Sequence, residues 1–146
     1  MYMIKNIKKC KKDTCIFCKI ANGEIPSTSI YEDDYFKVIL DLGPATKGHA
    51  LILPKDHAAD LFELPEDTAA KAMVLAKKLG KQMVENLKAD GMNLVQNNGE
   101  AAGQTVQHFH LHLIPRYKDD NQHILWNPGE VSKEEMEEIK NTIQQK

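Results

Sequence analysis

The stretch from His108 to Ile114 constrains the fold more than any other part of the chain. Polar and apolar residues alternate there, which is the period of a β-strand with one covered face. On this interpretation the apolar residues point into a core, and His108, His110 and His112 stand in a row about 6.5 Å apart on the other face. Such a row is costly unless it is used, because imidazoles compete for hydrogen bonds and repel one another when protonated. We therefore expect it to bind a metal or to handle a phosphate.

The size and charge of the chain exclude several classes of function. At 146 residues the chain predicts a single domain, here residues 15–146 behind a lysine-rich leader of residues 1–14. Its net charge of −2 disfavours polymeric nucleic acid as a partner. No apolar run reaches the length of a membrane span and no secretion signal is visible. We expect a cytoplasmic protein.

The remaining pattern predicts an α+β fold, with an antiparallel sheet packed by one long helix. A short helix after Cys15 and a C-terminal helix opened by a Ser132-x-x-Glu135 capping box complete the expected elements. Strands are expected at Ser29–Glu32, Tyr35–Asp41, His49–Pro54 and Met92–Asn97, and the long helix at Pro65–Ala89, closed by Gly91. The helix residues predicted to face the core are Ala69, Ala72, Met73, Ala76, Leu79, Gly80, Met83 and Leu87.

Cys15-x-x-Cys18 has the spacing of half a zinc site. Two further ligands are needed, and spacing alone does not choose them among His49, His57, His108, His112 and His123. The alternative is a pair of small buried side chains without a metal. A thioredoxin-like redox role fits poorly, because no strand of a βαβ unit precedes Cys15.

The histidine row also suits phosphoryl chemistry. A neutral imidazole has a ring nitrogen free to attack phosphorus, provided that a partner on the other nitrogen holds one tautomer. The preceding loop, residues 97–105, is rich in glycine and amides and can turn backbone N–H groups toward an anion. Neighbouring rings can then neutralise the charge that develops on the phosphoryl oxygens.

The histidine pattern resembles the signature of the histidine triad (HIT) family of nucleotidyl hydrolases and transferases. The likeness includes Gly103–Val106 before the triad and Pro115-Arg116 after it. It also includes Gly48–His57 and the opening Cys15–Ile20. The resemblance implies a HIT-like fold, and a homodimer whose sheet continues from one subunit into the other.

The resemblance also implies roles for individual residues. His110 would attack the α-phosphate of a nucleotide, with His112, His49 and Thr105 completing the catalytic group. The implied substrate contacts are Asp41 at the ribose hydroxyls, Asn97, Gly103, Gln104 and Thr105 at the phosphates, and Phe17, Ile20 and Leu40 at the purine. The implied ligands of a structural zinc ion are Cys15, Cys18, His57 and His108.

The predicted function is hydrolysis of purine nucleoside phosphoramidates or related nucleotide esters through a nucleotidyl-histidine intermediate. Cleavage of dinucleoside polyphosphates is one alternative, and a non-catalytic nucleotide-binding adaptor is another. A metalloenzyme with the triad itself as ligands is disfavoured, because residues 106–114 contain no carboxylate. Whether His123 and Trp126 reach the active site of the partner subunit stays open.

Overall fold

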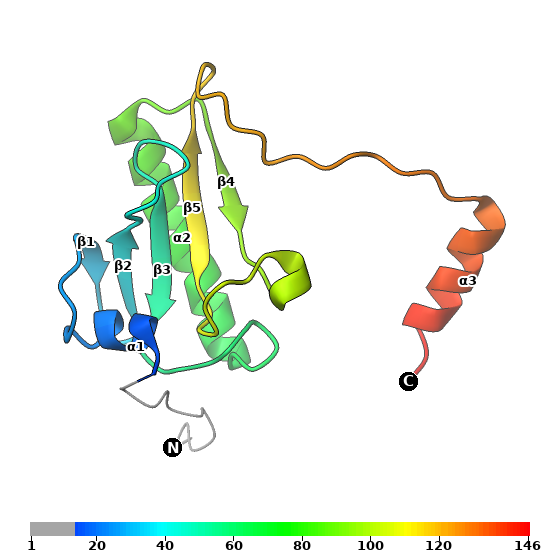
Figure 1. Cartoon of the computed structure of the whole chain (residues 1–146), viewed down its shortest axis with the longest axis horizontal. Helices are drawn as coiled ribbons and strands as arrows, with labels where there is room; N and C mark the ends of the chain where they lie inside the picture. The colour runs from blue at the N-terminus through cyan, green and yellow to red at the C-terminus, as the bar shows by residue number, and fades with distance from the viewer. Residues whose placement is uncertain (1–13) are drawn as a thin grey trace.

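The chain folds around one five-stranded antiparallel sheet in the order β1-β2-β3-β5-β4, with α2 packed across one face (Figure 1). The computed structural model describes residues 14–146, so all of the predicted leader except its last residue lies outside the described part. The elements are α1 (Ile16–Ala21), β1 (Ser29–Glu32), β2 (Phe36–Leu40), β3 (Ala50–Pro54), α2 (Glu66–Leu87), β4 (Gly91–Val95), the 3-10 turn η1 (Glu100–Ala102), β5 (Leu111–Arg116) and α3 (Lys133–Ile143). The predicted α+β fold with one long helix on an antiparallel sheet is confirmed.

The main core lies between the sheet and α2. All five residues of β3 are buried, as the apolar composition of that segment predicts. Ala72 and Ala76 of α2 are also buried, and their small side chains let the helix approach the sheet closely. The cluster of buried apolar residues joins α2 to β2, β3 and β5. This packing fixes the position of β3 and of the histidine-bearing segment beside it.

Two details of the predicted long helix are wrong. Met73, which we expected on the buried face, is 54% exposed. Successive helical residues are rotated by about 100°, so Met73 points away from the face on which Ala72 is buried. Gly91 does not close the helix. The helix ends at Leu87, where Lys88 adopts the left-handed conformation at φ 56°, and Gly91 is instead the first residue of β4.

The histidine strand begins later than the alternation predicts. β5 starts at Leu111, so His108 and His110 precede the strand and only His112 lies within it. The ladder with β3 stops at the pair Ile52↔Leu111, near Pro54, which has no N–H to extend it. The segment before β5 bonds elsewhere, with the Phe109 N–H donating to the Ala58 carbonyl at 2.7 Å. The three imidazoles therefore do not form one row.

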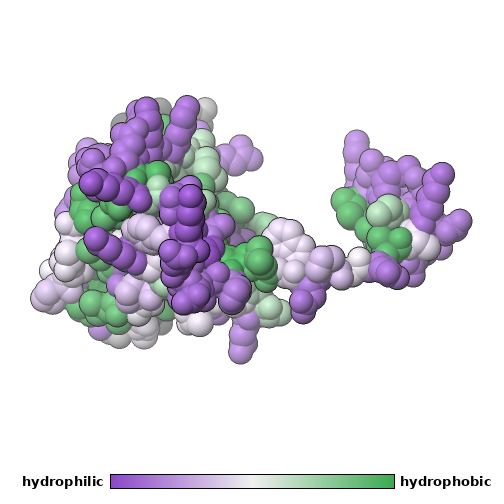
Figure 2. Space-filling view, turned by 90° about the horizontal axis from the view of Figure 1, so that it is seen from above, coloured by the Kyte–Doolittle hydropathy of each residue, from purple (hydrophilic) through white to green (hydrophobic). Residues whose placement is uncertain are grey.

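The C-terminal helix α3 lies apart from the sheet at the end of an extended segment (Figure 1). Its predicted capping box is present, since the Ser132 side chain accepts from the Glu135 N–H and the Glu135 side chain accepts from the Ser132 N–H. Met136, Ile139 and Ile143 are exposed, and Figure 2 shows hydrophobic side chains on the surface of this helix. Across residues 14–146, no helix is both long and apolar enough to cross a bilayer.

Gly48, directly before His49, adopts a backbone conformation that favours glycine. It has φ +92°, and a Cβ there would overlap Leu87 Cδ1 and lie 3.4 Å from Pro115 Cγ. We predict that Gly48→Ala lowers the free energy of unfolding by about 1–2 kcal/mol, the usual cost of a left-handed alanine. Urea denaturation followed by circular dichroism measures the change. Gly129→Ala is the matched control, because a Cβ at Gly129 meets no atom within 4 Å. Equal losses in the two variants would contradict this account.

Candidate functional site

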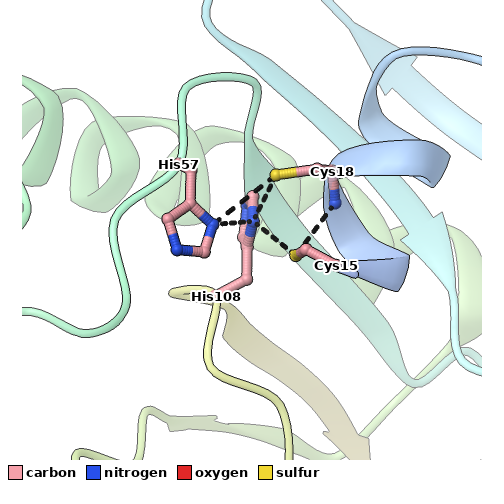
Figure 3. A group of neighbouring side chains, drawn as sticks. All are labelled: Cys15, Cys18, His57 and His108. Atoms are coloured by element: carbon pink, nitrogen blue, oxygen red, sulfur yellow. Dashed lines mark hydrogen bonds between the residues drawn. The ribbon is translucent and has the colours of Figure 1, made fainter. Parts of the chain in front are cut away.

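Four side chains from three separate segments converge beside the N-terminus of α1 (Figure 3). Cys15 is the N-cap of α1 and Cys18 lies in its first turn. His57 comes from the loop after β3 and His108 from the segment before β5. The sulfur and nitrogen atoms lie within 4.8 Å of one another. The structure therefore brings together the full ligand set that the resemblance implies.

The distances within this cluster match the edges of a zinc tetrahedron. Zinc–nitrogen bonds of about 2.05 Å and zinc–sulfur bonds of about 2.3 Å give edges of about 3.4 Å between two nitrogens and about 3.6 Å between nitrogen and sulfur. The His108 Nδ1 atom lies 3.5 Å from Cys15 Sγ, 3.4 Å from Cys18 Sγ and 3.2 Å from His57 Nδ1. Cys18 Sγ lies 3.5 Å from His57 Nδ1. The donor set and its spacing fit a tetrahedral metal ion.

The tautomer of His108 also suits a ligand. Its Nε2 atom lies 2.9 Å from the Pro54 carbonyl, which can only accept, so Nε2 carries the proton. Nδ1 then presents its lone pair to the other three side chains. Burial lowers the pKa of His108 to about 4, and a neutral imidazole is the form that binds metal. The hydrogen bond on the second nitrogen fixes the ring orientation, as is usual for metal-ligating histidines.

The other three histidines considered as ligands, and His110, lie outside this cluster. His49, directly before β3, contacts His112 of the neighbouring strand β5, and His123 lies exposed in the segment after β5. The choice of ligands that spacing left open is therefore decided in favour of His57 and His108. The triad serves two sites, with His108 in the cluster and the other two triad histidines in an adjacent pocket.

That pocket is a cavity of about 640 Å³ on the α1 side of the sheet, a size typical of small-molecule sites. His110, His112 and Thr105 supply its chemistry, and Asp41 adds a carboxylate. Its remaining walls are mainly apolar and consist of Ile16, Phe17, Ile20, Ile25, Pro26, Ser27, Thr28, Ile39, Leu40, Leu42 and Leu51. An apolar wall opposite imidazoles can take a flat ring at one end and an anion at the other.

A backbone carbonyl fixes the tautomer of His110. Its Nδ1 atom lies 2.8 Å from the carbonyl oxygen of His108, which can only accept, so Nδ1 carries the proton and Nε2 keeps its lone pair. The ring of Phe17 packs edge-on against His110 with centroids 4.9 Å apart. These two contacts fix the orientation of the His110 ring, which presents one unprotonated nitrogen in the pocket.

A chain of hydrogen bonds fixes the opposite tautomer on His112. The Ala45 N–H donates to His49 Nδ1 at 2.9 Å, so the proton of neutral His49 is on Nε2. That Nε2–H donates to His112 Nδ1 at 2.9 Å, which leaves the proton of His112 on Nε2. Asp41 Oδ2 lies 3.7 Å from His49 Nε2 and favours the same arrangement. His112 therefore presents a donor where His110 presents a lone pair.

The structure brings most of the predicted substrate residues to the pocket but not all of them. Phe17, Ile20, Leu40, Asp41 and Thr105 line it. Two side chains of the loop at residues 97–105 contact other parts of the protein instead. Gln104 is buried, donates to the carbonyls of Ala59 and Val106, and accepts from the Gly99 N–H. The amide of Asn97 lies beside Gly103, which has φ +96°. Asn97, Gly103 and Gln104 are not among the lining residues.

The sequence interpretation missed the segment between α1 and β1. Ile25, Pro26, Ser27 and Thr28 all line the cavity. Their only signal is position, since the segment follows a helix that was already assigned to the site. It also missed the backbone groups that set the histidine tautomers, which no side-chain pattern can reveal.

The pair formed by the buried His49 and the half-buried His112 makes stability depend on pH. Burial, with smaller contributions from His110 and His49, lowers the pKa of His112 to about 4 against a partial opposing effect of Asp41. Burial also lowers the pKa of His49. An unfolded histidine titrates near 6.5, so the unfolded chain binds more protons below that pH. The stability from His112 is present above pH 6.5 and is lost as pH falls from 6.5 to about 4.

We therefore predict a steeper loss of stability in wild type than in His112→Asn over that pH range. Urea denaturation at half-unit steps gives the slope, which should correspond to about one additional proton taken up by wild type on unfolding. Parallel slopes for the two proteins would show that His112 is not held neutral by the fold.

The comparisons with known proteins identify a family. The family model described as HIT domain matches residues 22–119. An adenosine 5′-monophosphoramidase of Saccharomyces cerevisiae is 44% identical over 116 residues, covering 80% of this chain and 71% of that protein.

Two solved structures extend the comparison. A HIT family protein from Bacillus anthracis superposes with a TM-score of 0.82 at 41% identity, over 90% of this chain and 95% of that one. A zinc-bound histidine triad family protein from Mycobacterium smegmatis superposes with a TM-score of 0.74 at 40% identity, over 81% and 86%. The split triad, the family match and these relatives together lead to one conclusion: the chain belongs to the histidine triad (HIT) family.

Proposed function

We propose that this protein hydrolyses purine nucleoside phosphoramidates or related nucleotide esters, with His110 as the nucleophile. The observation that carries the proposal is the pair of opposite tautomers, an unprotonated Nε2 on His110 beside an Nε2–H on His112. A lone pair can attack phosphorus, and a neighbouring donor can bind the phosphoryl oxygens or the leaving atom. The name of the yeast relative, a monophosphoramidase, supports the same substrate class.

The reaction would proceed in two displacements. In the first, a bond forms from His110 Nε2 to the α-phosphorus while the bond from phosphorus to the leaving nitrogen or oxygen breaks. The leaving atom takes up one proton from solvent, which we assign to transfer through the Thr105 hydroxyl. In the second, water attacks the phosphorus and gives up one proton to solvent while the bond from phosphorus to His110 Nε2 breaks, and a nucleoside monophosphate departs. The His108 carbonyl accepts the His110 Nδ1–H throughout, so the ring keeps its orientation.

The walls of the cavity suit the rest of a nucleotide. Phe17, Ile20 and Leu40 provide an apolar surface for a purine ring. Asp41 lines the same cavity, and a carboxylate can accept from both ribose hydroxyls at once. Its Oδ1 atom accepts from the Gly43 N–H at 2.8 Å, which orients the carboxylate group.

We further infer that the Cys15, Cys18, His57 and His108 cluster binds a structural zinc ion. The zinc-bound relative supports this assignment, as does the fit of the cluster to a tetrahedron. When bound, the ion would cross-link α1 to the two segments that carry the histidines. It is a closed four-ligand set, which is typical of structural rather than catalytic zinc. Reduced cysteine ligands also favour a cytoplasmic location.

A homodimer is the assembly that the fold favours. β4 is an edge strand of the described sheet, and Leu94 on it is 44% exposed. A groove beside it is lined by residues of α2 and β4: Ala76, Lys77, Gly80, Lys81, Val84, Glu85, Met92 and Leu94. A second copy could continue the sheet at this edge and cover the groove.

The nucleophile can be tested by trapping the intermediate. Wild-type protein mixed with an adenosine phosphoramidate and quenched early should gain the mass of one adenylyl group on intact-mass analysis. In His110→Ala the adduct should vanish and kcat/KM should fall at least about 10³-fold, because the attacking nitrogen is gone. Gln107→Ala, an exposed position in the same segment, is the control and should keep both. Nucleotide binding without an adduct or turnover would support a non-catalytic adaptor and would contradict the proposed enzymatic function.

The zinc assignment has a separate test. Protein purified without chelator should contain about one zinc ion per chain by elemental analysis, and Cys18→Ser should contain close to none. Chelation should lower the melting temperature of wild type, because the cross-link between segments is lost. Cys10→Ser, which alters a cysteine outside the described residues, serves as the control and should retain zinc. Wild-type protein free of zinc would contradict the assignment and leave the catalytic proposal standing.

A further inference from the structure

A single short helix connects the metal cluster to the nucleotide pocket. Cys15 caps α1 and accepts from the Cys18 N–H at 3.4 Å, so one end of the helix belongs to the cluster. The same helix supplies Ile16, Phe17 and Ile20 to the wall of the pocket. Residues of the cluster and residues of the pocket wall are interleaved along this six-residue helix. A shift of α1 at the cluster would therefore also shift the pocket wall.

The position of α1 depends on few other anchors. A helix of six residues is far below the length that is stable by itself in water. Ile20 and Ala21 pack into a small apolar cluster with Leu51 and Leu53 of β3, and Lys37 Nζ donates to the Ile20 carbonyl at 3.3 Å. These contacts lie at the C-terminal end of the helix. Nearer the N-terminal end, Phe17 also packs against this cluster, and Cys15 and Cys18 contact His57 and His108.

His108 forms a second connection. Its side chain belongs to the cluster, and its carbonyl accepts the His110 Nδ1–H at 2.8 Å. The ring of Phe17 touches both histidines edge-on, with centroids 6.1 Å from His108 and 4.9 Å from His110. The residue that ligates the metal therefore also orients the nucleophile, and one aromatic side chain packs against both.

We propose that metal binding and nucleotide binding are energetically coupled through α1 and His108. Cys15, Cys18 and His57 are on this account positioning residues for the nucleotide pocket, although they do not line it. The proposal rests on the proposed function, since it takes the cavity as a nucleotide site and the cluster as a zinc site. Binding of zinc would hold Phe17 against His110 and so preform the wall that receives the purine.

Linkage makes the coupling reciprocal. If zinc tightens nucleotide binding by a given factor, the nucleotide must tighten zinc binding by the same factor. Couplings between sites in proteins typically amount to about 5–150-fold. We expect a value in this range, with Phe17 carrying a large share of it.

The test is calorimetric titration of adenosine monophosphate into zinc-loaded and zinc-stripped protein, with circular dichroism to verify that the stripped sheet is intact. The dissociation constant should rise at least about fivefold on stripping. In the reverse experiment, competition with a chromophoric chelator should give a tighter zinc affinity in the presence of adenosine monophosphate. Both measurements are of binding and need no turnover.

Variants separate the coupling from simple loss of structure. Phe17→Ala should reduce the effect of adenosine monophosphate on zinc affinity, although the variant keeps all four ligands. Phe62→Ala removes a phenylalanine that is 83% exposed and lines no part of the pocket, so it should keep the wild-type coupling. If stripped protein loses its sheet, the chelator competition on wild type and Phe17→Ala decides the question.

The outcomes distinguish the two proposals. Equal dissociation constants in the two forms, or zinc affinity unaffected by the nucleotide, would overturn the coupling and leave the proposed function intact. A coupling that is the same in wild type and Phe17→Ala would overturn the assigned route through α1. No binding of adenosine monophosphate to either form would overturn the proposed function and the coupling together.

Discussion

The hydrogen bond from the His110 Nδ1–H to the His108 carbonyl is the interaction on which the account of this protein depends. It is 2.8 Å long and buried, and it decides which nitrogen of His110 holds a lone pair. The acceptor belongs to a residue whose own ring is fixed by the Pro54 carbonyl and by contacts with Cys15, Cys18 and His57. The His110 ring is therefore oriented by backbone groups that cannot exchange roles as donors and acceptors, in a segment supported by the buried strand β3.

Adjacent histidines with different partners can do different chemistry although they share a sequence motif. Donation by His108 to a carbonyl leaves its Nδ1 lone pair facing the cysteines and His57, and donation by His110 to a carbonyl leaves the lone pair on its Nε2. His112 accepts from His49 and is left with a donor. Burial lowers the pKa values of His108 and His112 to about 4, so both rings stay neutral and the assigned tautomers persist. His108 and His110 are buried and His112 is half-buried, and the defined hydrogen-bond partner of each ring offsets the cost of desolvation.

Much of the fold could be predicted from the sequence. The buried strand at Ala50–Pro54 and the long helix follow from hydrophobic pattern, and the C-terminal capping box from residue type and spacing. What failed were the boundaries that tertiary contacts set. The alternation of the histidine stretch predicts a continuous strand, but the Phe109 N–H bonds to Ala58 and the strand starts at Leu111. The alternation therefore predicted three histidines on one face of a strand, whereas the structure divides them between two separate sites.

The candidate site was only partly predictable for a similar reason. Spacing predicted half a zinc site but could not choose among five histidines, because the choice depends on which loops lie beside α1. Gln104 was expected at the phosphates, yet its side chain satisfies backbone groups of its own loop and of Ala59. The Ala45 N–H and the Pro54 carbonyl could not have been predicted at all, since every residue carries such groups and only the fold aims them.

The most direct test of the central claim is nitrogen-15 NMR of the imidazole rings in zinc-loaded, nucleotide-free protein at neutral pH. Long-range proton–nitrogen correlations identify which nitrogen of each ring carries hydrogen. The account predicts a proton on Nδ1 of His110 with Nε2 bare, and a proton on Nε2 of His112. A proton on Nε2 of His110, with Nδ1 bare, would contradict it.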